Sequence, residues 1–131
     1  MSDYEAVYAF WQRAGPGIAV RPSDRREEVE KKLTRDADLF LVAEQDARVV
    51  GVIMGVWDGR RGWLHHLAVD AAYGGRGIAI QLIEEVEGRL RAKGCLKVNL
   101  LVHRDNGRAR RLYSRMGYQQ MDALLPMGKK L

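Results

Sequence analysis

The alternation of apolar and polar positions predicts where helices form along the chain. Between Ala79 and Leu90 apolar residues recur at helical spacing on one face, and charged residues fill the other. Gly94 follows at the position where a glycine commonly ends a helix. Two further helices are predicted nearer the N-terminus, over Asp3–Arg13, whose apolar residues share a face, and over about Ser23–Arg35.

Four apolar segments have the lengths and residue types of strands. Short polar turns join the first three, which is a hairpin signal, and the fourth alternates apolar residues with Lys97 and Asn99. Because a helix separates the third segment from the fourth, the pattern suggests a βαβ-like unit. The four segments are Leu39–Glu44, Val49–Gly55, Trp63–Val69 and Leu96–Val102.

The turn from Tyr73 to Ala79 joins the third strand to the next helix and carries three glycines within four positions. Glycine permits positive φ and close approach of a ligand, and the first N–H groups of a helix have no intrahelical partner. With the helix macrodipole and the charge of Arg76, these groups favour a bound phosphate. The alternative is an ordinary strand-to-helix turn. The glycine spacing fits neither a dinucleotide-binding fingerprint nor a P-loop.

A last helix is predicted to follow Asn106 and to end at Gly117. The Asn106 side chain can accept a hydrogen bond from an unpaired N–H of the first turn, and Gly117 suits the C-terminal end. Tyr113 lies seven residues after Asn106, so both share a face, two turns apart. Taken alone, these residues are equally well explained by a helix cap and a core aromatic.

Together, the two segments resemble the acetyl-coenzyme A site of the GNAT superfamily of N-acetyltransferases, and the chain is similar to small bacterial YpeA-like members over about residues 4 to 131. The family's loop, Q/R-x-x-G-x-G/A, is matched at Gly77 and Ala79 but not at Gly74, which replaces Gln or Arg. Unless Arg76 supplies this contact to the pyrophosphate, weaker cofactor binding is expected. The family's N-x-x-A-x-x-L-Y-x-x-x-G-F/Y segment is matched in full by Asn106, Ala109, Leu112, Tyr113, Gly117 and Tyr118.

The resemblance implies an α+β fold in which helices flank a central mixed, mostly antiparallel sheet. At 131 residues the chain is expected to form a single domain, residues 1–131. Family members usually begin with a strand, whereas Asp3–Arg13 already has a helical pattern. The first strand is therefore expected to be absent or supplied by a partner chain. A homodimer would cover the sheet edge that this leaves open.

The resemblance also implies direct attack of a primary amine on the thioester of acetyl-CoA. A backbone N–H at Leu67, Ala68 or Val69 would stabilise the charge that develops on the thioester oxygen, and Tyr113 would protonate the departing thiolate. The residues expected to bind acetyl-CoA or coenzyme A are Leu67, Ala68, Val69, Gly74, Gly75, Arg76, Gly77, Ile78, Ala79, Asn106, Ala109 and Tyr113.

The general base is the least defined part of the predicted site. His65 and His66 lie on the third strand, and a histidine pKa suits a base at neutral pH. Adjacent strand residues point to opposite faces, so only one of the two is expected to face the active-site cleft. The alternative is that both pack on the sheet, with Glu44 or Asp70 as the base. No metal is expected, because the two histidines diverge and Cys95 is the only cysteine.

Composition narrows the remaining possibilities. The net charge is +5, and arginines cluster around the last helix, where they would face coenzyme A phosphates or solvent. Clustered basic charge also fits nucleic-acid binding, although no nucleic-acid motif is present; a non-catalytic coenzyme A-binding or regulatory module is the other alternative. The single Cys95 fits a packed thiol and a cytoplasmic location, and no run is apolar enough for a membrane span.

The sequence does not define the amine acceptor. The segments expected to shape its site are the loop from Gly15 to Pro22, the hairpin from Trp57 to Trp63, and the segment from Asp122 to Met127. Trp57 and Trp63 would either line this site or pack on each other across the hairpin.

Overall fold

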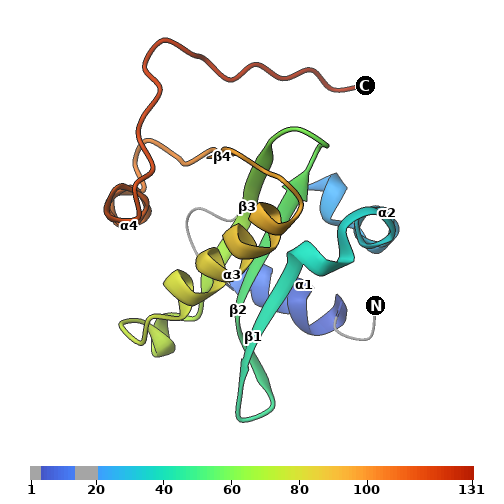
Figure 1. Cartoon of the computed structure of the whole chain (residues 1–131). Helices are drawn as coiled ribbons and strands as arrows, with labels where there is room; N and C mark the ends of the chain where they lie inside the picture. Colours follow the sequence, from blue (N-terminus) through green and yellow to red (C-terminus); the bar gives the residue numbers. More distant parts are fainter. Residues whose placement is uncertain (1–3, 14–20) are drawn as a thin grey trace. The chain divides into compact units, whose positions relative to one another are not determined.

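The computed structural model describes residues 4–13 and 21–131 (Figure 1). Its internal contacts divide the chain into two compact units, Met1–Leu101 and Val102–Leu131. The single domain expected from the length stays a prediction, and each unit is described by itself. Most of the predicted loop from Gly15 to Pro22 lies outside the described residues.

The first unit alternates helices and strands in the predicted order. Its helices are α1 (Tyr4–Arg13), η1 (Pro22–Asp24), α2 (Arg26–Asp36), η2 (Ala37–Leu39), η3 (Ala71–Tyr73) and α3 (Ile78–Ala92). Its strands are β1 (Phe40–Gln45), β2 (Arg48–Trp57), β3 (Gly62–Val69) and β4 (Val98–Leu100). The predicted second helix is divided in two, because Arg25 has extended backbone between η1 and α2.

The strands form one mixed sheet in the order β1-β2-β3-β4. The β1–β2 and β2–β3 pairs are antiparallel, and β4 runs parallel to β3, which confirms the mixed, mostly antiparallel sheet. Within the described residues no strand precedes α1, so β1 lies at an edge of the sheet. Pairing of this edge with a partner chain stays a prediction.

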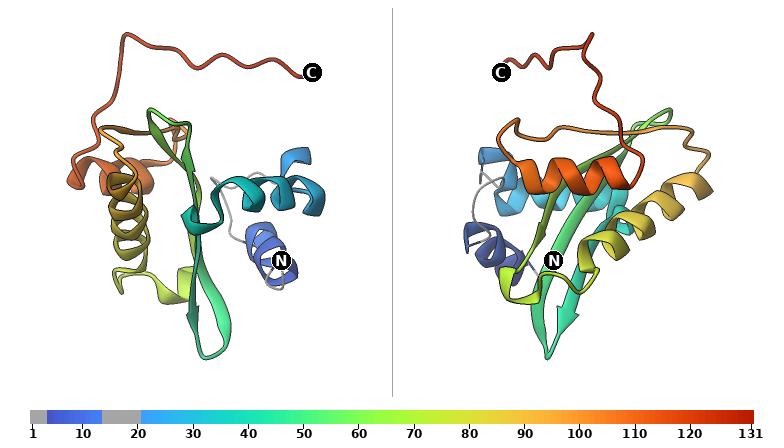
Figure 2. Two further views of the ribbon diagram at one scale, coloured as in Figure 1. Left: turned by 45° about the vertical axis from the view of Figure 1, so that its right-hand side comes forward. Right: turned by 90° about the vertical axis from the view of Figure 1, so that its left-hand side faces the viewer.

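On one face of the sheet, α3 packs closely against the backbone (Figure 2). Val86 and Leu90 of α3 are fully buried. Glycines in the strands make this approach possible: a Cβ added at Gly55 would lie 2.7 Å from Val86 Cγ1, and one at Gly62 would lie 2.7 Å from Leu90 Cδ1. The side chains of α3 can therefore pack directly on the backbone of the strands.

On the other face, α1 and α2 cover the sheet (Figure 2). Phe10 and Trp11 of α1 are almost completely buried, and they pack with Val29 of α2 and with Val52 and Ala68 of the sheet. Burial of two aromatic side chains from one short helix fixes α1 in place, since burying each large apolar side chain contributes about 2 kcal/mol.

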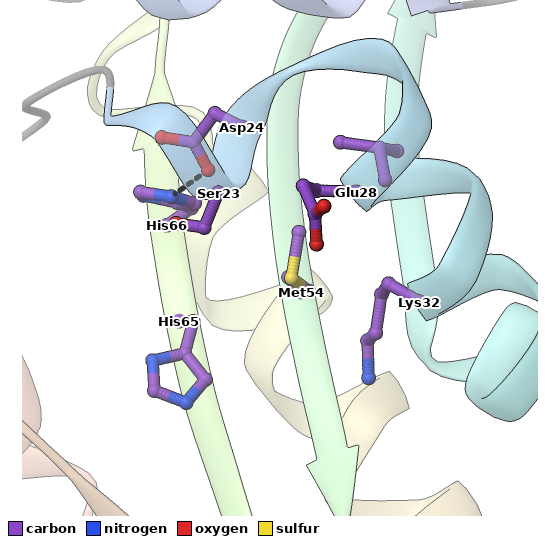
Figure 3. Close-up of a pocket in the computed structure, with 8 residues that line it drawn as sticks. Ser23, Asp24, Glu28, Lys32, Met54, His65 and His66 are labelled. Atoms are coloured by element: carbon purple, nitrogen blue, oxygen red, sulfur yellow. Dashed lines mark hydrogen bonds and ion pairs between the residues drawn. The ribbon is translucent and has the colours of Figure 1, made fainter. Parts of the chain in front are cut away.

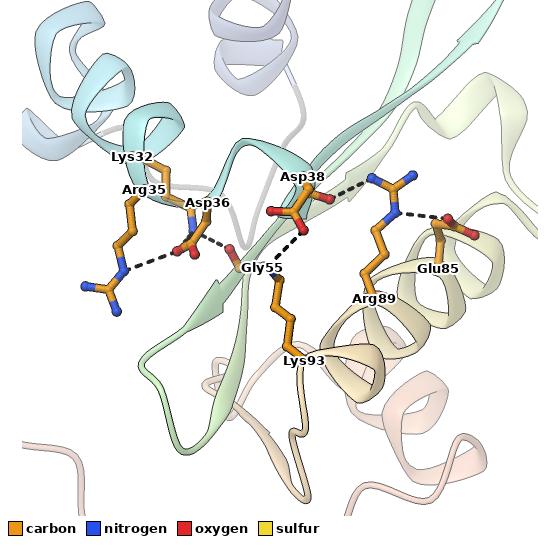
Figure 4. Close-up of polar contacts among 8 residues, drawn as sticks. All are labelled: Lys32, Arg35, Asp36, Asp38, Gly55, Glu85, Arg89 and Lys93. Carbon is orange, nitrogen blue, oxygen red and sulfur yellow. Dashed lines mark hydrogen bonds and ion pairs between the residues drawn. The ribbon is translucent and has the colours of Figure 1, made fainter.

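Polar contacts connect α2 to β2 and α3 to η2 at one end of the sheet (Figure 4). Lys32 of α2 donates to Asp36 Oδ2 at 2.8 Å and to the Gly55 carbonyl of β2, and both charged side chains are largely buried. Arg89 of α3 donates to the Asp38 carbonyl at 2.7 Å, while Lys93 Nζ lies 3.1 Å from the Asp38 carboxylate. Burial lowers the pKa of the Lys32 ammonium from its ordinary value.

The β4 strand is shorter than the predicted segment Leu96–Val102. Only three residues of β4 pair with β3, and Leu96 and Leu101 on either side are exposed. Cys95, just before β4, is buried and donates its S–H to the Lys97 carbonyl at 3.2 Å. This placement fits the packed thiol. None of the described helices is both long and apolar enough to cross a membrane.

The second unit contains one helix, α4 (Gly107–Arg115). Asn106 Oδ1 accepts a hydrogen bond from the Ala109 N–H at 3.1 Å, and Gly117 follows the helix with φ of 93°. Both predicted ends are confirmed. Arg110 donates to the Arg104 carbonyl and to Gln120. No residue of 102–131 is fully buried, and Tyr113 is among those that are partly buried.

Candidate functional site

The central strand β3 contains a β-bulge at His66. Ala68 pairs with Val52 and His65 pairs with Met54, so two residues of β3, His66 and Leu67, stand opposite one residue of β2. His66 has φ of 52°, in the left-handed region. A non-glycine residue held there costs about 1–3 kcal/mol, and such strain is concentrated at functional sites.

The bulge brings both histidines into one pocket (Figure 3). The expectation that only one of them faces the cleft is wrong, because an extra residue in the left-handed conformation breaks the alternation of side chains along β3. The pocket has a volume of about 330 Å³. It is lined by Ser23, Asp24, Glu28, Val29, Lys32, Met54, His65 and His66. A cavity of this size is within the range of small-molecule sites.

The His66 ring is held on two sides. Its Nε2 lies 2.8 Å from Oδ1 of Asp24, whose side chain is only 4% exposed. The centre of the Trp11 ring lies 5.0 Å from that of His66. Sequence reasoning missed Asp24, because the two partners of this hydrogen bond are 42 residues apart. Serine and aspartate before a helix are typical of helix caps, so their residue types do not indicate a histidine partner.

His65 has a different environment in the same pocket. The residue is accessible to solvent, and its ring has no hydrogen-bond partner among the described residues. Protein atoms that crowd the ring lower its pKa from the ordinary value, with smaller contributions from His66 and Lys32. The imidazole is therefore neutral at pH 7. Trp63 stacks on His65 with ring centres 6.4 Å apart, and it is not directly opposite Trp57, which pairs with Gly62.

The strands β3 and β4 separate beyond Leu64. Their parallel pairing covers Gly62–Leu64 of β3 only, whereas β3 continues to Val69. The Asp70 N–H donates toward β2, to the Val50 carbonyl at 2.8 Å. Because backbone N–H groups alternate sides along a strand, those of Val69 and Leu67 point the other way. In the described part of the chain no strand pairs with them there, so these donors are available to a ligand.

The glycine-rich turn after β3 has the backbone that its sequence predicts. Gly75 and Gly77 have φ of 77° and 76°, and a Cβ at either position would meet open space. No side chain caps α3, and its first turn contains no acidic residue. Arg76 stacks on Tyr73 with its guanidinium carbon 4.9 Å from the ring centre. Unpaired N–H groups beside an arginine therefore fit the phosphates of coenzyme A.

Gly74 has φ of −64°, a value that any residue adopts, so nothing in the backbone requires glycine at this position.

Of the two fallback candidates for the general base, Asp70 accepts the Ala72 N–H at 2.9 Å and serves as a cap of η3. Glu44 is not among the residues that line the pocket. Residues 4–13 and 21–131 contain no group of three or more potential metal ligands.

Tyr113, the predicted proton donor, lies on α4 in the second unit. Its ring meets that of Tyr118 edge-on, with centres 5.8 Å apart. Burial raises the pKa of Tyr113 to about 12, so its hydroxyl keeps its proton at neutral pH. Asn106 and Ala109 of the same motif bond to each other, which supports the capping interpretation for Asn106.

Comparison with known proteins places this arrangement in a family. The model of the Acetyltransferase (GNAT) family matches residues 4–118. An acetyltransferase of Sodalis glossinidius is 44% identical over 130 residues, covering 98% of this chain and 89% of that protein. An acetyltransferase of Pectobacterium atrosepticum is 41% identical, with the same coverage of both chains.

Solved structures share the fold. The PaiA N-acetyltransferase of Thermoplasma acidophilum, in complex with coenzyme A, superimposes with a TM-score of 0.79 at 24% identity, over 92% of this chain and 86% of that chain. The aminoglycoside acetyltransferase AAC(6')-Iy, bound to a bisubstrate analogue, gives 0.77 at 18% identity, over 99% and 93%. The family match over most of the chain and the two relatives above 40% identity show that the chain belongs to the GNAT family of acetyltransferases.

Proposed function

We propose that this acetyltransferase moves the acetyl group of acetyl-CoA to a primary amine that enters the pocket at His65 and His66. The observation that carries the proposal is the bulge in β3, which lies between unpaired backbone donors and a pocket that contains a neutral histidine. A donor substrate on one side of β3 and an acceptor on the other would meet at this point.

Acetyl-CoA supplies the acetyl group as a thioester, and enzymes of the GNAT family use it as donor. In the proposed complex, the N–H groups of Leu67 and Val69 bind the donor along β3, beside Ala68. The phosphates lie on the turn Gly74–Ala79, where Arg76 adds charge. Residues of the Asn106–Tyr113 segment complete the site in our proposal.

The chemical roles follow from the environment of each group. The Leu67 N–H, fixed by the bulge, stabilises negative charge on the thioester oxygen, where such a donor acts most strongly. His65 takes the proton of the attacking amine, because it is neutral and has no other partner in the described residues. His66 is not assigned this role, since Asp24 occupies its Nε2. Tyr113 protonates the departing thiolate.

The pocket suits an acceptor that is cationic in solution. Asp24 is paired with His66, and Lys32 with Asp36. Within residues 4–13 and 21–131, Glu28 pairs with Lys31 alone, and the Lys31 side chain is 72% exposed, so this pair is weak. Glu28 is therefore available to attract an ammonium group.

We also propose a cytoplasmic location, which fits the free Cys95 thiol. A homodimer that pairs through the β1 edge of the sheet is proposed as well.

The first experiment is calorimetric titration of the protein with acetyl-CoA and, separately, with coenzyme A, followed by a panel of amines with acetyl-CoA. Micromolar binding of the donor and transfer to at least one amine are expected. Binding without transfer to any amine would favour a non-catalytic coenzyme A-binding module. No binding at millimolar donor would contradict the assigned donor site.

Replacement of Tyr113 by phenylalanine tests the proton donor. Tyr113→Phe keeps the ring and its contact with Tyr118 but removes the hydroxyl, so kcat is expected to fall on the order of 10²-fold. The calorimetric Kd for acetyl-CoA should stay within about threefold, because the hydroxyl is proposed to act only when the thiolate departs. A threefold change in Kd corresponds to about 0.7 kcal/mol. Tyr118→Phe is the matched control, with kcat close to that of the wild type. An unchanged kcat in Tyr113→Phe would remove Tyr113 from the mechanism.

A further inference from the structure

His66 occupies a backbone position that normally belongs to glycine. Bulges with a left-handed residue usually place glycine there, because a side chain makes this conformation costly. The other non-glycine residues with positive φ in the described chain, Asp46 and Ala47, lie in the β1–β2 turn, where such values are ordinary. His66 is within a strand, so something outside the strand must hold it.

Asp24 provides this support from η1. Its Oδ1 bonds the His66 ring at 2.8 Å, and its Oδ2 accepts the Arg21 N–H at 2.8 Å. The backbone of Asp24 is fixed as well: its N–H donates to the Arg21 carbonyl at 2.8 Å, and its carbonyl accepts the Tyr4 hydroxyl at 2.9 Å. The carboxylate is thus buried, rigid and aimed at one side chain, which is what a clamp on the His66 conformation requires.

The conformation of His66 determines the orientation of the peptide group that follows it. The φ and ψ angles of His66 set the direction of the next peptide unit, which carries the Leu67 N–H. We propose that Asp24 is a positioning residue: by holding His66 in the left-handed conformation, it keeps the bulge formed and the Leu67 N–H aimed at the thioester oxygen. This inference rests on the proposed function, because it gives a catalytic purpose to the bulge.

A competing role for the pair is a catalytic dyad, in which Asp24 orients His66 as the general base. The two roles differ in what glycine does at position 66. His66→Gly removes the imidazole but adopts a left-handed conformation freely, whereas His66→Ala removes the imidazole and retains the strain. Positioning requires only the backbone, while a dyad requires the ring.

The kinetic test compares Asp24→Ala, His66→Ala, His66→Gly and the double variant Asp24→Ala/His66→Gly, with acetyl-CoA and the best amine of the panel. We expect kcat to fall about 10- to 100-fold in Asp24→Ala and His66→Ala, since loss of a whole oxyanion donor costs about 10²- to 10³-fold. His66→Gly should be at least about tenfold more active than His66→Ala. Adding Asp24→Ala to His66→Gly should cause no further loss.

Equal losses in His66→Gly and His66→Ala would overturn the positioning role and favour the dyad. A further loss on adding Asp24→Ala to His66→Gly would also overturn it, because Asp24 would then act through something other than His66. If Asp24→Ala does not fold, as judged by circular dichroism, the comparison of the two His66 variants decides the question without it.

A second readout needs no activity. In the free protein, the ¹³Cα and ¹³Cβ chemical shifts of residue 66 report its backbone conformation. They should move from left-handed to extended values in Asp24→Ala. Asp36→Asn is the matched control, because Asp36 is the other buried aspartate on this face but binds Lys32, and the shifts should stay unchanged. Unchanged shifts in Asp24→Ala overturn the clamp. A changed shift in a protein that acetylates no amine supports the clamp and rejects the proposed function.

Discussion

The two faces of the sheet are built in different ways. On the α3 face, glycines at positions 51, 55 and 62 let the helix lie directly on the strands, with apolar contacts throughout. On the face that carries α1 and α2, longer side chains separate helices from strands, and the two buried aspartates, Asp24 and Asp36, are both found there. The pocket opens on this second face only, among the residues that line it from α2, η1 and β3.

The two faces therefore differ in how closely their helices pack on the strands. Close contact fixes the start of α3, where the phosphates are proposed to bind, since a Cβ added at Gly51 would lie 3.1 Å from Ile78 Cγ2. On the opposite face, α2 meets the sheet through the apolar Val29 and through Lys32, which donates to the Gly55 carbonyl of β2, and both residues line the pocket.

The strongest test of this comparison is the removal of the buried cation on the pocket face. Lys32→Met leaves the Asp36 carboxylate, 5% exposed, with only the more distant Arg35 as a partner. Stability should fall by about 3 kcal/mol, because a buried charge loses its counterion. Urea denaturation measures the change. The neighbouring Lys31→Met, at an exposed pair, should change stability by less than about 0.5 kcal/mol. Equal effects would show that α2 does not depend on buried charge.

The second test asks whether the pocket face carries the base. His65→Gln should lower kcat/KM about 10²-fold at pH 8. Because the pKa of His65 is lowered, wild-type kcat/KM should rise with pH through a value below about 6.5 and then level off. In the variant this rise should vanish. His103→Gln, outside the pocket, is the control and should keep the wild-type profile. An unchanged profile in His65→Gln would reject the base.

The third test addresses the α3 face. Gly55→Ala places a methyl group against Val86 and within 3.2 Å of the Leu39 carbonyl, so stability should fall by about 2 kcal/mol. Gly88→Ala, inside α3 where a Cβ meets nothing, should instead raise stability by about 0.8 kcal/mol through helix propensity. Thermal unfolding of both variants measures the opposite signs. A neutral Gly55→Ala would mean that α3 is not in close contact with the strands.

The parts of the fold that depend on local chemistry could be predicted from the sequence. The α3 helix follows from the spacing of its apolar residues and from Gly94, which has φ of 95°. The start of α4 follows from Asn106, whose side chain caps it as expected. In each case the deciding interaction lies within a few residues, so residue type and spacing are sufficient.

The resemblance implied a bulge in the third strand, but the left-handed conformation of His66 and the lining of the pocket could not be predicted, because they depend on distant partners. The residue type of His66 alone does not predict its positive φ, because few non-glycine residues adopt such values. The conformation depends on Asp24, which the fold brings from 42 residues away. The length of β4 also depends on a partner distant in sequence. Alternation predicted a strand of seven residues, but β4 ends where it separates from β3. The family resemblance indicated the region of the site. It did not indicate the charged residues of the pocket, which belong to α2 and η1.

The buried Cys95 simplifies measurement of the reaction. It is the only cysteine in the chain, the residue is 9% exposed, and its thiol donates to the Lys97 carbonyl. Each acetyl transfer liberates one free thiol on coenzyme A. A thiol-reactive chromogenic reagent should therefore react with the released coenzyme A and only slowly with Cys95 of the folded enzyme. Turnover can then be recorded continuously for any amine without labelling the acceptor.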